Sequence, residues 1–244
     1  MANVRTLRRR IRSVQNTAKI TKAMQMIAAS KMRRAQQATL SGRPYEEKLR
    51  GVLADLAAQP MDMEEVHPLL QHRDVRNIQL IHITPDRGLC GGLNGNLNRA
   101  SGKFILDQSA TVSVIAIGRK GRDFMARSGR DVQAVFSDMG DRPNITDITP
   151  VSHLAIEGYV TGKIDQVLVT YSEFVSTAVQ RPVIRQLLPV EPATLGAGQS
   201  VGYIFEPSGV AVLDTLLPRF VEMELYHAVL ESIASEHSAR MVAM

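Results

Sequence analysis

The sequence predicts an α/β fold in which a mainly parallel sheet is flanked by two long terminal helices that pair as an antiparallel coiled coil. Three observations support this fold class. The first 41 residues contain no Gly or Pro. Uncharged residues recur at both chain ends with alternating spacings of three and four, as in a heptad repeat. Between these ends, short apolar runs alternate with segments of helical pattern.

The N-terminal part, residues 1–58, is predicted to be a coiled-coil helix because it is rich in Ala, Met, Gln, Lys and Arg. Ile20, Met24 and Ile27 lie beside its heptad seam and widen the apolar surface beyond what one partner helix would cover. Thr21 and Gln25 are polar seam positions, which usually fix register. The full seam is Val4, Leu7, Ile11, Val14, Ala18, Thr21, Gln25, Ala28, Met32 and Ala35.

The C-terminal part, residues 208–244, repeats this pattern, and Pro218 is expected to bend or delay its helix. Residues 206–244 carry six acidic and two basic side chains, whereas residues 1–45 carry eleven basic side chains and no acidic one. We therefore expect the two helices to pair and to protrude as one rod. The second seam is Leu216, Phe220, Met223, His227, Leu230, Ala234, His237, Met241 and Met244.

The central part, residues 75–200, reads as an α/β domain with a mainly parallel sheet. Strands are expected at 78–84, 112–118, 132–136 and 166–171, and helices at 93–106, 120–127 and 148–160. Segments 174–179 and 181–187 could add a strand or hairpin. Residues 189–200 read as a surface loop that leads into 201–205 and the final helix.

The glycine-rich loop at 86–95 follows an expected strand and opens an expected helix, where phosphate-binding loops are found. Its spacing is G-x-x-G-G-x-x-G, which is neither a dinucleotide fingerprint nor a P-loop. A tight turn that lets helix and sheet approach closely is the plainer interpretation. The single Cys90 could be a nucleophile, but a small buried thiol fits better, and it excludes an internal disulfide. The histidines lack metal-ligand spacing, so no metal site is expected.

The basic N-terminal helix has alternatives to the rod. A transit peptide is also rich in Arg, but it would not merge into a long heptad pattern. Binding to nucleic acid or to a membrane surface suits the charge, although residues 1–44 contain no aromatic side chain. No apolar run is long enough to cross a bilayer and no secretory signal is evident, so no transmembrane segment is expected.

Four segments in the same order along the chain closely resemble the gamma subunit of bacterial and organellar ATP synthases. The first two are residues 14–33 and the loop Asp86-Arg-Gly-Leu-Cys-Gly-Gly-Leu-Asn94. The other two are Arg185-Gln-Leu-Leu-Pro189 and residues 234–244. The resemblance covers the whole chain. It implies a Rossmann-like central domain at the base of a coiled coil made by the two chain ends.

The resemblance further implies a rotary central-stalk subunit without catalytic, cofactor or metal residues of its own. Its partners would be the alpha and beta subunits around the rod, the epsilon subunit and the membrane ring of c subunits, with no nucleic acid. Lys22 and Met24 would contact the stator, and Tyr203 and Glu206 would contact the c ring. The protein would lie peripherally on the cytoplasmic face of a bacterial cell membrane and take part in proton-driven ATP synthesis.

Two features depart from the family. Members generally continue beyond residue 244, so the second helix is expected to be short. The cysteine insertion of chloroplast relatives is also absent, so thiol regulation is not expected. Two alternative functions stay open at this point, a nucleotide-binding α/β enzyme with helical arms and a basic coiled-coil protein that binds nucleic acid.

Overall fold

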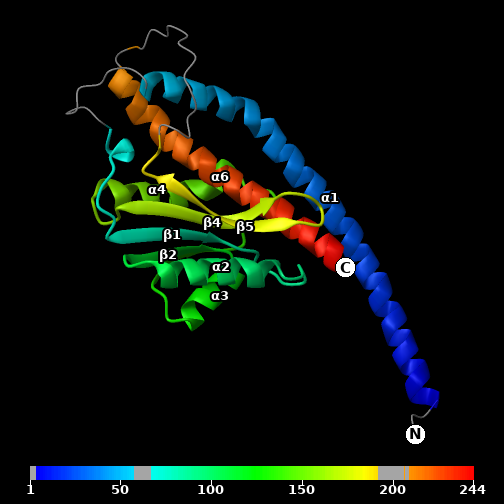
Figure 1. Ribbon diagram of the computed structural model, residues 1–244. Coiled ribbons are helices and arrows are strands. Elements are labelled where there is room, and N and C mark those ends of the chain that lie inside the picture. Colours follow the sequence, from blue (N-terminus) through cyan, green and yellow to red (C-terminus); the bar gives the residue numbers. More distant parts are fainter. Residues whose placement is uncertain (1–3, 58–66, 192–205, 207–208) are drawn as a thin grey trace.

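A computed structural model describes residues 4–57, 67–191, 206 and 209–244. Its centre is a five-stranded sheet with the order β3-β2-β1-β4-β5. Strands β1 to β4 are parallel, and β5 is antiparallel to β4. Their bounds are β1 (Asn77–Ile83), β2 (Thr111–Ile117), β3 (Val132–Phe136), β4 (Gln166–Phe174) and β5 (Gln180–Leu188). The mixed sheet and the long terminal helices in contact confirm the predicted fold class (Figure 1).

Helices cover both faces of the sheet (Figure 1). On one face lie α2 (Leu93–Asp107) and α3 (Arg119–Arg127), and on the other lie α4 (Ile145–Val160) and α6 (Gly209–Ala243). A short 3-10 turn, η2 (Pro68–Leu70), precedes β1. Every strand and helix expected between residues 78 and 171 is present, with shifted ends. Of the strand or hairpin expected at 174–179 and 181–187, the hairpin is present, because β5 pairs antiparallel with β4 and residues 175–179 form the turn between them.

The apolar character of β1 follows from its central position. All of its residues after Asn77 are buried, as expected for a parallel strand covered on both faces. Leu80 pairs with Val114 on β2 and with Leu168 on β4. Ile78 and Leu80 pack under α2 and α3, whereas alternate β1 residues join the larger core under α4 and α6. The sheet is therefore a rigid base to which the long helices attach.

Helix α1 (Val4–Ala57) is the longest element and runs antiparallel to α6 (Figure 1). It continues through Gly42 and Pro44 without ending. Helix α6 begins nine residues before Pro218, so the expectation that this proline delays the helix is wrong. A proline in a helix removes one backbone hydrogen bond, and the buried residues on both sides of Pro218 hold α6 together.

The two helices do not protrude together as one rod. Helix α6 packs against β4 and α4, and its residues from Leu213 to Ala239 contribute to the buried interior. Only the N-terminal part of α1 extends beyond the end of α6 (Figure 1). The predicted antiparallel pairing of the two helices is confirmed, but over the described residues α6 lies between the sheet and α1 instead of standing clear of the domain with α1.

Candidate functional site

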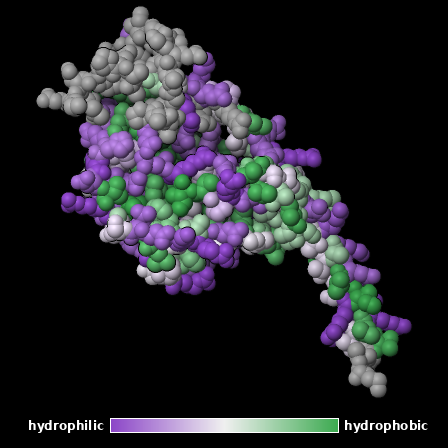
Figure 2. Space-filling model, in the orientation of Figure 1, coloured by the Kyte–Doolittle hydropathy of each residue, from purple (hydrophilic) through white to green (hydrophobic). Residues whose placement is uncertain are grey.

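The most distinctive surface is the part of α1 that extends beyond the rest of the molecule. All side chains from Leu7 to Ile20 are exposed. Figure 2 shows apolar and strongly polar side chains side by side along this extension. It carries Arg8, Arg9, Arg10, Arg12 and Lys19 and no carboxylate. The exposed cations therefore form a strongly basic surface along this part of α1.

Four predicted seam residues lie on this extension and are not buried. Val4, Leu7, Ile11 and Val14 are between 45% and 68% exposed. Helix α6 is described as far as Ala243 and does not reach these four residues, so their packing against the C-terminal helix stays a prediction. Their heptad spacing still defines one apolar face of α1.

The seam becomes buried where α1 meets α6. Ala28, Met32 and Ala35 are at most 8% exposed, and the small side chains let the two helices approach closely. Further along, a β-carbon on Gly42 would lie 2.8 Å from Nε2 of His227 on α6. At the far end, Arg50 Nη2 donates to Glu224 Oε1 at 2.6 Å. This order of contacts makes the helix pair antiparallel.

The seam residues proposed on α6 are buried to different degrees. Phe220 and Leu230 are buried, and Leu216, Met223 and Met241 are half-buried. Other α6 residues face the sheet, where Val221 and Leu225 are fully buried. The heptad on α6 therefore describes one of its two apolar faces. The sequence pattern did not reveal the second face because uncharged residues surround nearly the whole C-terminal half of the helix.

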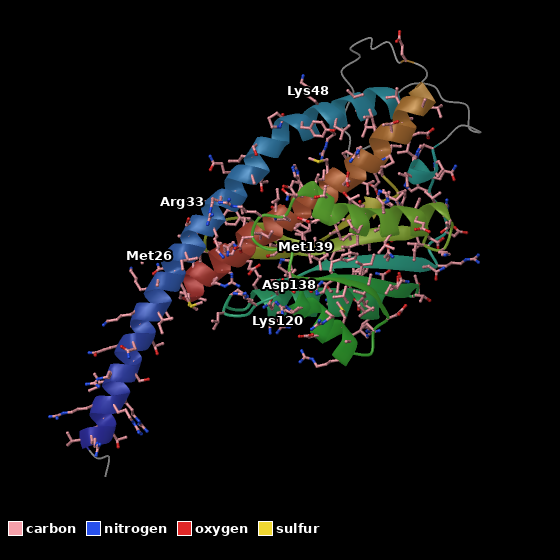
Figure 3. The ribbon with its side chains drawn as sticks, turned by 180° about the vertical axis from the view of Figure 1, so that it is seen from behind. Met26, Arg33, Lys48, Lys120, Asp138 and Met139 are labelled. Atoms are coloured by element: carbon pink, nitrogen blue, oxygen red, sulfur yellow. The ribbon has the colours of Figure 1, made fainter. Side chains whose placement is uncertain are left out.

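Lys22 and Met24 lie at the base of the extension. Lys22 is exposed, whereas Met24 is half-buried. Met24 borders a cleft of about 640 Å³ between α1, the glycine-rich loop and the loop after β3, together with Ile27, Lys31 and Leu89. Met26, on another side of α1, is 60% exposed (Figure 3). Glu206 is exposed, and Tyr203 lies outside the described residues.

The glycine-rich loop has a structural role in the described chain. Arg240 near the end of α6 donates from Nη2 to the Gly88 carbonyl oxygen at 3.3 Å. Cys90 is buried with Leu93 and Leu97 of α2 and Ala239 of α6. Burial raises the pKa of the Cys90 thiol, so it remains protonated and is a poor nucleophile. The loop thus docks α6 against α2.

Asp86, at the start of this loop, occupies the edge of the sheet where a nucleotide would bind. Its carboxylate accepts hydrogen bonds from the backbone N–H groups of Arg119 and Asp138, both at 2.9 Å. These N–H groups follow β2 and β3, so one side chain ties three strand ends together. A carboxylate here repels phosphate and uses the donors that a phosphate would need. The geometry favours the close-packing interpretation over a nucleotide site.

The histidines serve the fold. His67 Nδ1 accepts from the Leu69 N–H at 3.1 Å and so caps η2. His237 is buried on α6, and burial lowers its pKa to about 4, so the ring is neutral near pH 7. Within the described part of the chain, no three metal-binding side chains come together. The same residues contain no helix of the length and apolarity required to cross a membrane.

Sequence reasoning missed two residues that organise this region, Asp86 and Asp141. Asp86 opens the glycine-rich loop three residues after β1, and an acidic side chain so close to the end of a buried strand is a signal for hydrogen bonding to nearby backbone N–H groups. Asp141 lies in the loop between β3 and α4 and contacts both long helices. No local pattern marks it, because its partners are 110 and 96 positions away in the chain.

Comparisons with known proteins agree with this architecture. A family model described as ATP synthase matches residues 3–244. The chain is 56% identical over all 244 residues to an ATP synthase gamma chain of Dehalococcoides mccartyi and spans 86% of that protein. It is 52% identical to the gamma chain of Herpetosiphon aurantiacus, again over the whole chain and 86% of the relative.

Two solved structures show a similar fold. The central stalk and c-ring structure of the Tetrahymena thermophila mitochondrial ATP synthase includes a chain that aligns with a TM-score of 0.71 at 25% identity. That alignment covers 92% of this chain and 97% of the other. A rotor chain of the Euglena gracilis mitochondrial ATP synthase aligns with a TM-score of 0.66 at 22% identity, covering 98% and 88%.

Proposed function

The chain belongs to the ATP synthase gamma chain family, whose members are non-catalytic rotor subunits of the central stalk, and we propose that its α1 extension is the part that engages the stator. In this proposal the alpha and beta subunits surround residues 4–27. The charge of this segment supports it, because residues 7–20 are exposed and carry five Lys or Arg side chains and no carboxylate.

Charge and shape suit this role. The extension presents cations without carboxylates, so acidic loops of a surrounding hexamer would attract it at many rotational positions. Long-range electrostatic attraction of this kind would keep the extension between the alpha and beta subunits without fixing one orientation. Lys22 and Met24 lie where the extension meets the bulk of the molecule, and we assign them the turning contact. A flexible thioether suits a surface that slides past several slightly different partners.

The opposite end of the molecule would face the membrane ring. Glu206 precedes α6, and with Tyr203 it is our candidate for contact with the c subunits. The epsilon subunit would bind this same end of the molecule. The assembly would sit peripherally on the cytoplasmic face of a bacterial cell membrane. Replacing Glu206 by Lys should weaken proton pumping and spare ATPase activity of the soluble complex, and unchanged pumping in rebuilt membranes would remove Glu206 from this assignment.

Rotation transmits free energy by differential contacts. As the asymmetric extension turns, each beta subunit meets a different face of α1, and its affinity for nucleotide changes accordingly. The rotor needs no nucleotide site for this task. The carboxylate of Asp86 at the strand ends is the observation that argues most directly against the nucleotide-binding alternative.

Assembly tests the proposal. The chain should co-elute with the alpha and beta subunits of its own organism on size-exclusion chromatography and should raise their ATPase activity. A variant with Ile11 and Val14 both changed to Asp should assemble less well, since the charged side chains would lose hydration between the alpha and beta subunits. Co-elution that is equally strong without residues 4–27 would contradict the proposal.

A further inference from the structure

In a rotor, torque would have to pass from the sheet domain into α1 through the contacts where the exposed part of α1 meets the rest of the molecule. Between Lys22 and Met32, α1 changes from an exposed helix to one packed on α6. Buried contacts there involve Ala28 and Met32, which are apolar. Apolar contacts are non-directional, so they favour burial of this face of α1 without selecting particular partner atoms. A directional contact at this level would have a separate role.

Asp141 supplies such a contact. Its Oδ2 atom forms an ion pair with Lys31 Nζ on α1, and its Oδ1 atom lies 3.0 Å from His237 Nε2 on α6. The two oxygens of one carboxylate therefore reach both long helices. Partial burial is the largest single effect and would raise the pKa of Asp141, but the hydrogen bonds and charges of Lys31 and His237 together outweigh it, so the pKa is lowered. The carboxylate is thus charged near neutral pH.

The loop that carries Asp141 is fixed to the sheet. Asp138 and Gly140 both have positive φ angles, 62° and 75°, so this loop follows a narrowly defined path. The Asp138 N–H donates to Asp86 Oδ2 at 2.9 Å, and the Asp138 carboxylate accepts from Arg119 Nη2 at 2.7 Å. Figure 3 shows Asp138 and Met139 on the side of the domain that faces the helices. Asp141 is thereby tied to the ends of β1, β2 and β3.

The α6 side of this contact is fixed as well. Arg240 Nη1 lies 3.2 Å from His237 Nδ1, and Arg240 Nη2 donates to Glu236 Oε1 at 2.6 Å and to the Gly88 carbonyl oxygen. Because a guanidinium can only donate, Nδ1 of the neutral imidazole accepts and the ring proton is on Nε2, facing Asp141. Asp141 therefore meets a held partner on α6 and, through Lys31, the part of α1 where the buried contacts are made by Ala28 and Met32.

We propose that Asp141 is a positioning residue that sets the rotation of α1 about its own axis relative to the sheet domain, so that torque passes into the extension. The proposal rests on the rotor function argued above. An exposed ion pair contributes little to global stability. Loss of Asp141 should therefore change the orientation of α1 and the coupling of rotation far more than it changes unfolding.

The first experiment measures orientation in the full chain alone. Spin labels are placed on cysteines at Ala18 of α1 and Leu154 of α4, which are both exposed, whereas Cys90 is buried. Pulsed electron resonance then gives the distribution of label distances. For Asp141→Asn, alternative positions of α1 should become about two to five times more populated, the equilibrium factor for one exposed ion pair. Lys31→Gln should give the same change.

Two variants separate positioning from general loosening. Glu224→Gln breaks the Arg50–Glu224 pair, which also joins α1 to α6 but lies at the far end from the extension. It should leave the distance distribution unchanged. Exchanging the charges, with Lys31→Asp and Asp141→Lys in one chain, should restore part of the original distribution, because it forms the ion pair to α1 again, whereas the Nε2–H group of His237 cannot accept from a lysine.

The second experiment uses the assembled complex and compares protons pumped per ATP hydrolysed. Asp141→Asn should lower this ratio, and the charge exchange should restore it in part. Distance distributions that are identical for the wild type, Asp141→Asn and Lys31→Gln would overturn the proposal. A changed distance distribution with an unchanged ratio of protons pumped per ATP would overturn the claim that Asp141 is needed to pass torque into the extension. Failure of the wild-type chain to assemble would instead count against the rotor function, because the distance measurement needs no partner.

Discussion

Gly118 lies so close to Thr84 that a β-carbon on it would be 1.9 Å from the Thr84 carbonyl oxygen. The two residues follow β2 and β1, and Gly118 has a φ angle of 90°, which side-chain-bearing residues rarely adopt. This contact brings α3 against the sheet at the edge where Asp86 holds the strand ends.

Gly118→Ala should therefore lower the free energy of unfolding by about 3 kcal/mol or more, because it combines a steric clash with backbone strain. Urea denaturation of the isolated chain measures the loss. Gly95→Ala is the matched control, since Gly95 lies on α2 with open space around it, and it should be neutral or stabilising by about 0.5–1 kcal/mol. Equal stabilities for both variants would disprove the close approach.

Replacement of Ile11 and Val14 by Asp in the isolated chain should change the free energy of unfolding by no more than about 0.5 kcal/mol, because both side chains are already in water. Met32→Asp should instead cost about 3 kcal/mol, since a carboxylate would be buried between α1 and α6. Thermal unfolding followed by circular dichroism compares the two. A large drop for the double variant would mean that the extension has a partner within the chain.

Much of the fold could be predicted from the sequence, because the signals for its elements are local. The buried run of β1 and the heptads of the long helices predicted their type and order. Two features depend on residues far apart in the chain, the partners of α6 and the contacts of Asp141. Whether α6 pairs with α1, with the sheet or with both depends on how far each helix runs, and residues 4–14 have the same spacing whether or not a partner is present. Asp141 acts through residues distant in the chain, so no spacing rule could identify it.

Acid should destabilise the chain through His82. Its ring is fully buried on β1, with Nε2 2.9 Å from Asn98 Oδ1 and Nδ1 3.0 Å from Ser101 Oγ. Burial lowers its pKa from 6.5 to about 4. The unfolded chain then binds a proton at a higher pH than the folded chain, so this contribution is complete above about pH 6.5 and is lost as the pH falls toward 4.

The expected loss from this one group is about 3 kcal/mol. Urea midpoints measured at intervals between about pH 7 and pH 4 report the slope. His82→Gln should be less stable near pH 7 but should show a shallower slope, whereas His153→Gln, on the exposed side of α4, should keep the original slope. An unchanged slope in the His82 variant would show that other groups control the acid sensitivity.

Met24→Lys should impair coupling without unfolding the chain. Met24 is half-buried beside a cleft, so its replacement should alter the melting temperature little, while an added ammonium facing an acidic stator loop would favour some rotor positions over others. Proton pumping per ATP hydrolysed is the readout, and Met26→Lys is the control on the same helix. A large fall in melting temperature with normal pumping would assign Met24 to packing alone.

The most direct test of the rotor assignment is to watch the chain turn. In a complex immobilised through its beta subunits, a bead attached to a cysteine at Leu154, which is exposed on α4, reports the motion of the sheet domain. Addition of ATP should produce continued rotation in a single direction that stops when ATP is removed, and Asp141→Asn should weaken the torque. A bead that only fluctuates about one position while the same complexes hydrolyse ATP would contradict the account.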